Sequence, residues 1–173
     1  SKDDPYSLSD NAVYSLCEDR ESGIWVGSYF GGVDYYPKSY TYFEKYYPKD
    51  GDNNLQGKRV REFCQDNKGI LWIGTEDGGL NRFDPSTKTF SFFAPSSGFT
   101  NIHGLCMVGD KLWVGTFSKG LKIVDTNTGN ILKTYQKNGS PRSLIDNSIF
   151  AICRTTTGDI YLGTMFGLLK YNG

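Results

Sequence analysis

The residues of this chain that could perform chemistry are few, and none has an evident catalytic partner. His103 is the only histidine, and acid–base or nucleophilic catalysis would need a nucleophile or carboxylate beside it. Glu18-Asp19 and Asp66 could form the carboxylate pair of a glycosidase, but they lie in turns, where aspartate commonly binds the backbone. We therefore predict no catalytic residue and interpret His103 as an ordinary strand residue.

One acidic run is similar to the start of a calcium-binding loop, Asp50-Gly51-Asp52-Asn53-Asn54. Such a loop needs glycine at its sixth position for the turn and glutamate at its twelfth as a bidentate ligand. Leu55 and Arg61 occupy those positions. We therefore predict no metal site and interpret the run as a polar linker.

Four cysteines could form disulfides or bind zinc, but their placement favours neither. Each ends a short apolar stretch at the same point of a repeated pattern, so rotation relates them and they do not face one another. No pair has the Cys-x-x-Cys spacing of a zinc site. We interpret them as small buried apolar side chains, with a disulfide or zinc as the alternatives. They are Cys17, Cys64, Cys106 and Cys153.

A fourfold repeat relates the cysteines and is the strongest signal in the sequence. An aromatic residue, an aliphatic residue, glycine, and serine or threonine recur at intervals of 47, 41 and 48 residues. Periods of this size indicate repeated supersecondary units. The copies are Trp25-Val26-Gly27-Ser28, Trp72-Ile73-Gly74-Thr75, Trp113-Val114-Gly115-Thr116 and Tyr161-Leu162-Gly163-Thr164.

The stretches around these motifs are short, rich in β-branched and aromatic residues, and separated by turn residues, which predicts strands. Four antiparallel strands at a period of about 45 residues form one blade of a β-propeller. We therefore predict an all-β chain of four-stranded antiparallel β-propeller blades, a partial propeller of three full blades plus most of a fourth. The fourth strand of the first blade is predicted at Tyr40 to Tyr47. The chain, 1–173, is predicted to be one propeller fragment with blades at about 11–47, 58–93, 101–136 and 147–171.

The repeat resembles one propeller family closely. Leu-x-x-Asn-x-Val, Asp-x-x-Gly, Leu-Trp-Ile-Gly-Thr, Gly-Gly-Leu and Arg-Phe-Asp are similar to the two-component regulator propeller repeat, most cleanly over Val60 to Asp84. The resemblance covers the chain from about Leu8 to Tyr171. It implies the periplasmic sensor region of an inner-membrane hybrid two-component histidine kinase of Bacteroidetes-type bacteria, responding to oligosaccharides. No kinase sequence is present here, so we expect binding and signal transmission, not catalysis.

The composition of the chain limits the classes of partner that it is expected to bind. Nineteen Lys and Arg residues balance nineteen Asp and Glu residues, and a formal net charge of zero argues against nucleic acid. No apolar run approaches membrane-spanning length, so we expect no direct membrane insertion of this segment. No motif implies a cofactor.

The blade count raises the question of closure. Propellers usually close with roughly four to eight blades, so an open arc would expose apolar faces on its first and last blades. The chain begins and ends within a repeat, and we interpret it as a piece of a longer protein. We expect self-association, with two arcs forming a dimer that completes a ring, and a self-closed four-bladed ring is the alternative.

Residues that differ between repeats while occupying matching loops are the candidates for ligand binding. The linker into the first strand and the loop after the second usually open on the same face of a propeller. Aromatic rings there would stack on sugars, and polar groups would bind hydroxyls or acidic substituents. Alternatively, these aromatics pack between blades or at a protein interface. The predicted ligand-binding residues are Tyr29, Phe30, Arg59, Glu76, Asp77, Phe117, Lys119 and Phe166.

The favoured function is a ligand-sensing propeller segment of an extracytoplasmic two-component sensor, with an oligosaccharide as the ligand. The first alternative is a protein-interaction propeller without a small-molecule site. The second is a fragment of a propeller lyase or glycosidase, which would need an acid–base constellation that we do not find.

Overall fold

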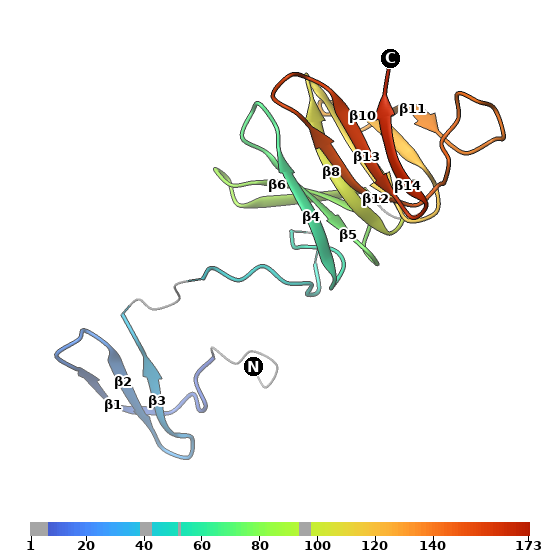
Figure 1. Ribbon diagram of the computed structural model, residues 1–173. Coiled ribbons are helices and arrows are strands. Elements are labelled where there is room, and N and C mark those ends of the chain that lie inside the picture. Colours follow the sequence, from blue (N-terminus) through green and yellow to red (C-terminus); the bar gives the residue numbers. More distant parts are fainter. Residues whose placement is uncertain (1–6, 39–42, 52, 94–97) are drawn as a thin grey trace. The chain divides into compact units, whose positions relative to one another are not determined.

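The computed structural model describes residues 7–38, 43–51, 53–93 and 98–173, which form strands and turns and contain no helix (Figure 1). Four antiparallel sheets follow one another, each with its strands in chain order or in the exact reverse. The chain divides into two compact units, Ser1–Lys45 and Tyr46–Gly173. The all-β prediction is confirmed for the described residues.

The first unit holds one three-stranded sheet, and the second holds three sheets that correspond to the remaining repeats. The strands of the first sheet are β1 (Val13–Glu18), β2 (Ile24–Ser28) and β3 (Gly32–Tyr36). Those of the second unit are β4 (Val60–Gln65), β5 (Leu71–Thr75), β6 (Leu80–Asp84), β7 (Thr89–Phe93), β8 (Ile102–Val108), β9 (Lys111–Thr116), β10 (Leu121–Asp125), β11 (Ile131–Tyr135), β12 (Ile149–Arg154), β13 (Ile160–Thr164) and β14 (Gly167–Tyr171).

The predicted fourth strand of the first blade is wrong over the residues that can be seen. Residues 43–47 form no strand, and residues 40–42 lie outside the described part of the chain. The ring of Tyr46 instead packs on Phe83 and Phe90, with centroids 4.8 and 5.5 Å away. This aromatic contact belongs to the second unit.

Neighbouring blades of the second unit meet at the glycine of the repeated motif. A Cβ atom built on Gly74 would overlap Cγ2 of Ile102, and one built on Gly115 would lie 2.7 Å from Cγ2 of Ile149. Both isoleucines are completely buried. The first strand of each following blade therefore comes closer than any side chain at the glycine would allow.

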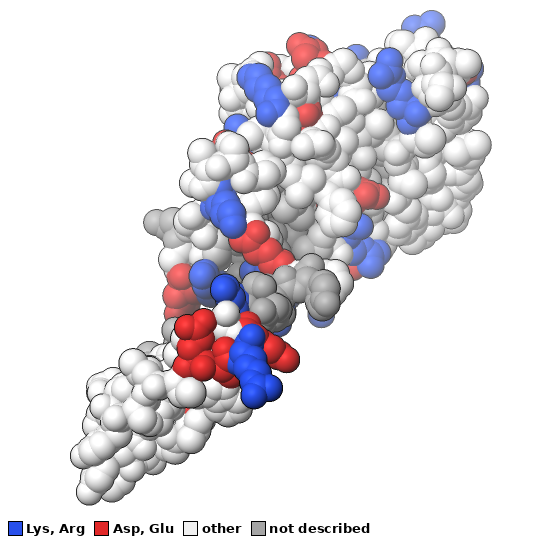
Figure 2. All heavy atoms as spheres, turned by 90° about the vertical axis from the view of Figure 1, so that its left-hand side faces the viewer, with Lys and Arg blue, Asp and Glu red and all other residues white. Residues whose placement is uncertain are grey.

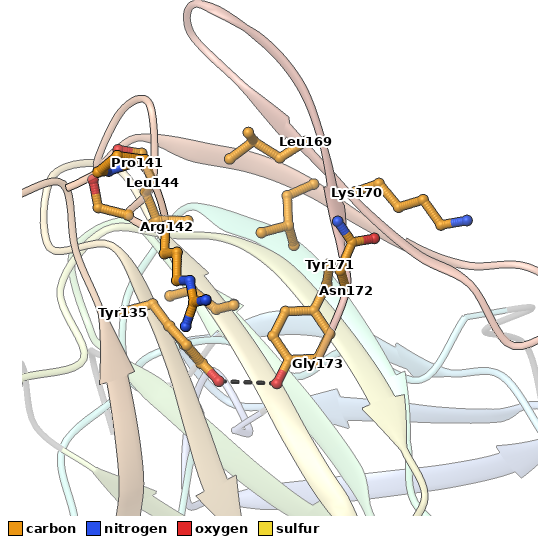
Figure 3. A pocket seen from close by; sticks show the side chains of 12 residues that line it. Tyr135, Pro141, Arg142, Leu144, Leu169, Lys170, Tyr171, Asn172 and Gly173 are labelled. Carbon is orange, nitrogen blue, oxygen red and sulfur yellow. Dashed lines mark hydrogen bonds between the residues drawn. The ribbon is translucent and has the colours of Figure 1, made fainter. Parts of the chain in front are cut away.

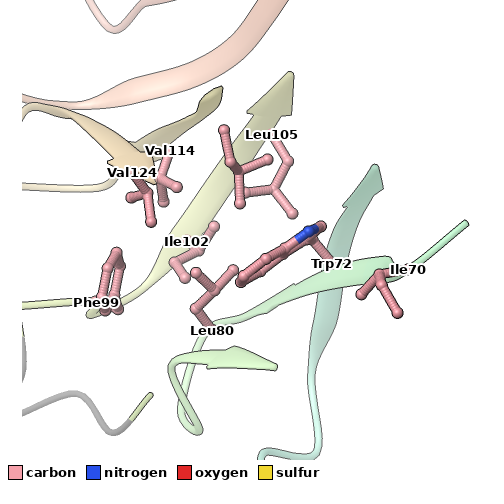
Figure 4. Packing of buried hydrophobic residues seen from close by; sticks show 9 residues of the cluster. Ile70, Trp72, Leu80, Phe99, Ile102, Leu105, Val114 and Val124 are labelled. Atoms are coloured by element: carbon pink, nitrogen blue, oxygen red, sulfur yellow. The ribbon is translucent and has the colours of Figure 1, made fainter. Parts of the chain in front are cut away.

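The motif tryptophan extends this contact into a core. Figure 4 shows Trp72 projecting from β5 toward Ile102 and Leu105 of β8, beside Leu80. Trp113 belongs to a second cluster, which contains Ile149 of the next blade. Each inter-blade interface is thus built from the aromatic face of one blade and the first strand of its successor.

In the first two blades, the aspartate of the turn after the first strand accepts a hydrogen bond from the motif tryptophan. Oδ2 of Asp66 accepts a hydrogen bond from Nε1 of Trp72 at 3.0 Å, and its Oδ1 accepts from the backbone of Lys68 and Ile70. Asp19 binds Nε1 of Trp25 at 2.9 Å in the same way. Because both oxygens of Asp66 are engaged in holding the turn, the turn interpretation is supported over a catalytic carboxylate.

The last blade leaves its aromatic face uncovered within the second unit. Leu168 is 69% exposed, whereas Leu121, at the same repeat position, is 1% exposed. The cysteines follow this pattern: Cys64 and Cys106 are half-buried, and burial raises the pKa of both thiols. Cys17 and Cys153 are exposed, so the prediction that all four are buried is wrong for these two. All four are free thiols.

Replacing the inter-blade glycine should destabilise the second unit. We expect Gly115→Ala to lower the free energy of unfolding by about 1–3 kcal/mol, because the new methyl group would overpack Ile149. Gly163→Ala is the matched control, since its Cβ would meet Ala151 at an ordinary 3.5 Å. Chemical denaturation of both variants checks this, and equal losses would contradict the assigned role of the glycine.

Candidate functional site

Every first strand carries a β-bulge at the same repeat position. The register shifts between Val13 and Ser15, Val60 and Glu62, Ile102 and Gly104, and Ile149 and Ala151. A bulge leaves one residue out of the ladder and re-aims its side chain. The bulged residues are Tyr14, Arg61, His103 and Phe150.

Three of these bulged residues come together, because β4, β8 and β12 lie side by side in the second unit. Nη2 of Arg61 lies 3.2 Å from Nδ1 of His103. The ring of His103 in turn lies 5.3 Å from that of Phe150, centroid to centroid. Three successive blades thus contribute a cation, an imidazole and a phenyl ring to one place.

Backbone hydrogen bonds bring the loop after each second strand to the linker that enters the first. The N–H of Glu76 donates to the carbonyl of Arg59 at 3.0 Å, and that of Phe117 to Asn101 at 2.9 Å. The equivalent bonds in the other blades join Tyr29 to Ala12 and Met165 to Ser148. Linker and loop residues of each blade therefore lie together, as the sequence predicts.

We call the resulting set the bulge cluster: Arg59, Arg61, Glu76, Asn101, His103, Phe117 and Phe150. In its polar half, Arg61 Nη1 lies 3.2 Å from Glu76 Oε1, and Arg59 Nη1 lies 3.7 Å from Glu76 Oε2. Two guanidinium groups therefore share one carboxylate. Arg59 and Arg61 remain substantially exposed and can reach a ligand.

Hydrogen bonding fixes the protonation of His103. A guanidinium can only donate, so Nδ1 accepts from Arg61 and the proton resides on Nε2, which donates to Asn101 Oδ1 at 2.8 Å. Desolvation, and then the charge of Arg61, lowers the pKa of His103, against an opposing effect of Glu76. His103, a residue of β8, is therefore a neutral connector between the polar and aromatic halves.

The aromatic half consists of two phenyl rings beside the imidazole. Phe117 lies 5.8 Å from His103, and Phe117 and Phe150 meet edge-on at 6.0 Å. Both phenylalanines are 37% exposed. An apolar surface that solvent can reach therefore lies one imidazole away from the guanidinium of Arg61.

The structure places only some of the predicted ligand-binding residues in the bulge cluster. Arg59, Glu76 and Phe117 belong to the bulge cluster. Asp77 accepts hydrogen bonds from the backbone of Lys58 and Arg59 at 3.0 and 3.3 Å, and so holds the linker. Lys119 and Phe166 are exposed on loops of their own blades. In the first unit, Tyr29 stacks on Tyr14 at 5.2 Å and meets Phe30 at 4.3 Å.

The candidates predicted from sequence did not include Arg61, His103 or Phe150, which the structure adds to the candidate site. The available signal was that four chemically different residues, including Tyr14, occupy one slot of an otherwise regular repeat. We interpreted that position as an ordinary strand position, because no residue type in this sequence distinguishes a bulged position from a regular one.

A separate cavity of about 410 Å³ lies between β11, the linker at residues 141–144 and β14. Figure 3 shows Tyr135 and Tyr171 at its wall, joined by a hydrogen bond of 3.0 Å between their hydroxyl groups. None of its lining residues belongs to the bulge cluster. It adjoins β14, an edge strand, whereas the equivalent β10 is flanked by β11.

The described residues give no sign of a metal centre or a membrane-spanning helix. They contain no group of three or more His, Cys, Asp or Glu side chains able to hold a metal ion, and no helix long and apolar enough to cross a membrane. In the calcium-like run, Asn53 Oδ1 accepts from the backbone of Phe90 at 2.6 Å, while Asp52 lies outside the described residues. Basic and acidic groups are interspersed on the face drawn in Figure 2.

Comparisons with known proteins agree with the geometry. The model of the two component regulator propeller family matches residues 7–30 and 54–77, which hold the first two strands of the first and second blades. Over these two stretches the chain matches the two component regulator propeller repeat. The propeller prediction is thereby confirmed, and no curated protein matches the chain.

Two extracellular domains from B. thetaiotaomicron are similar in structure to this propeller chain. That of BT3049, assigned as a hybrid two component system, has a TM-score of 0.61 and 25% identity, covering 97% of this chain and 22% of its own. The extracellular domain of BT4673 has two similar structures, one assigned as a one component system and the other as a hybrid two component system. The structure with the one component assignment has a TM-score of 0.58 and 26% identity. That match covers 96% of this chain and 22% of the other. The propeller chain therefore spans about a fifth of these relatives.

The lowered pKa of His103 predicts a loss of stability on acidification. The unfolded chain binds this proton near pH 6.5, whereas the folded chain resists it, so the stabilisation is complete above that pH and is lost as the pH falls through the folded pKa. We expect the free energy of unfolding to fall between about pH 7 and about pH 5.5, and less so in His103→Gln. Denaturation at the two pH values checks this, and an identical fall in both proteins would contradict it.

Proposed function

We propose that this chain is a ligand-sensing propeller segment of an extracytoplasmic two-component sensor, and that an oligosaccharide binds at the bulge cluster. The observation that supports this most directly is the cluster itself, where exposed aromatic rings adjoin two arginines and an amide. The likeness to extracellular domains of two-component systems supports the location and the signalling role.

The cluster has the chemistry of a sugar site. Phe117 and Phe150 offer apolar surface to the C–H faces of a pyranose, while Arg59, Arg61 and Asn101 offer hydrogen-bonding groups for its substituents. Because the residues come from three blades, a bound ligand would link those blades. A ligand with unequal affinity for two arrangements of the sensor would shift the balance between them.

Catalysis fits the cluster poorly. Its one carboxylate, Glu76, is paired with both arginines, and both ring nitrogens of His103 are occupied. Hydrolysis of a glycoside needs two carboxyl groups with separate roles. A histidine kinase would have to be supplied by other parts of the whole protein, as the hybrid two component assignment of the relative suggests.

Binding to the chain tests the proposal. We expect isothermal titration against a panel of plant and host oligosaccharides, neutral and acidic, to identify a ligand whose affinity falls about tenfold in Phe150→Ala. Phe92→Ala is the matched control, because Phe92 is also exposed but lies on β7, the outermost strand of its blade. Absence of binding across the panel, or equal losses in both variants, would favour a protein-interaction propeller.

We further propose that the chain self-associates through the uncovered face of its last blade. Leu168 is exposed where the equivalent Leu80 and Leu121 are buried by the following blade. We expect sedimentation at micromolar concentration to show a dimer that Leu168→Asp dissociates, because a charge cannot be buried there without a partner. A wild-type chain that sediments as a monomer would contradict this.

A further inference from the structure

We propose that the bulge cluster recognises a carboxylate-bearing sugar, a uronate, whose carboxylate replaces Glu76 on Arg61. This inference rests on the proposed sugar-binding function and specifies the ligand class of the same site. It starts from the charges of the cluster, which are unbalanced.

Two arginines in the cluster face one acid. Arg59 and Arg61 share Glu76, and His103 is neutral because its Nδ1 accepts from Arg61. Next to them, Asp77 accepts hydrogen bonds from the backbone of Lys58 and Arg59, and its charge interacts with that of Arg59, while Lys58 adds a further cation. With Lys58 and Asp77 counted, three cationic side chains stand against two carboxylates, so the cluster and its immediate neighbours carry one net positive charge.

The existing ion pairs can be exchanged. The Arg61 side chain is 44% exposed, and ion pairs accessible to water contribute little stability. The contact from Arg59 to Glu76, at 3.7 Å, is longer than a charge-assisted hydrogen bond. A ligand carboxylate could form a bidentate pair with a guanidinium group at little cost in lost protein contacts.

The aromatic half sets where such a carboxylate would lie. His103 contacts Arg61 through Nδ1, and its ring also lies against Phe117 and Phe150. A pyranose stacked on these rings would direct an equatorial substituent toward the guanidinium. A uronic acid carries its carboxylate in that position, whereas the corresponding neutral sugar carries a hydroxymethyl group.

Matched pairs of ligands test this inference. The probes are the tetrasaccharides of galacturonate and of hyaluronan, each compared by isothermal titration with the same oligosaccharide after reduction of its carboxyl groups to alcohols. We expect at least one uronate to bind about tenfold or more tightly than its reduced form, with an affinity that falls as salt is added.

Two substitutions of opposite effect locate the interaction. Arg61→Gln should remove most of the preference for the acid, whereas Glu76→Gln should tighten binding of the uronate several-fold by freeing the arginines. A variant that gains affinity cannot be explained by misfolding. Arg142→Gln, in the linker that borders the separate cavity, is the control and should leave the affinity unchanged.

The outcomes separate the inference from the proposed function. Equal or tighter binding of the reduced sugars overturns the preference for a uronate but leaves oligosaccharide binding intact. Failure of both uronates to bind also overturns it, and the neutral sugars of the wider panel then decide whether the chain binds oligosaccharides. Tighter binding of the acids that Arg61→Gln does not alter would place their carboxylate elsewhere and overturn the assigned site.

Discussion

The structure depends on the close approach of a first strand to the motif glycine of the preceding blade. Ile102 is buried on Gly74 and Ile149 on Gly115, and both contacts exclude a side chain at the glycine. The residue after each isoleucine is the bulged residue, His103 or Phe150. Anchoring the isoleucine in the interface therefore holds the next side chain in the bulge cluster, so that the same contact builds the scaffold and positions the site.

Much of the fold could be predicted because the repeat is regular. The spacing of Trp72, Trp113 and their equivalents predicted strands and blades, since packing of successive blades requires the same aromatic and glycine at each step. The prediction of a fourth strand in the first blade failed over residues 43–47, where the ring of Tyr46 packs on Phe83. The prediction that Cys153 is buried also failed, because burial at that repeat position depends on a following blade.

The candidate site could be predicted only in part. Arg59, Glu76 and Phe117 were accessible to sequence reasoning because matching loops of a propeller share one face. Arg61, His103 and Phe150 were not, since a bulge changes the direction of a side chain without changing residue type. The repeat therefore marks what every blade needs, and the positions where residue types diverge inside its regular frame are the candidates for ligand binding.

The measurement that tests the bulge cluster most directly is a nuclear magnetic resonance titration of the isotope-labelled chain with an oligosaccharide that binds it. We expect the largest shifts at the backbone amides of Arg61, Glu76, His103, Phe117 and Phe150, residues that lie far apart in the sequence and meet in the bulge cluster. Large shifts confined to the outer strands β7 and β11, or to the cavity beside Tyr171, with these five amides unchanged, would contradict the assignment of the site.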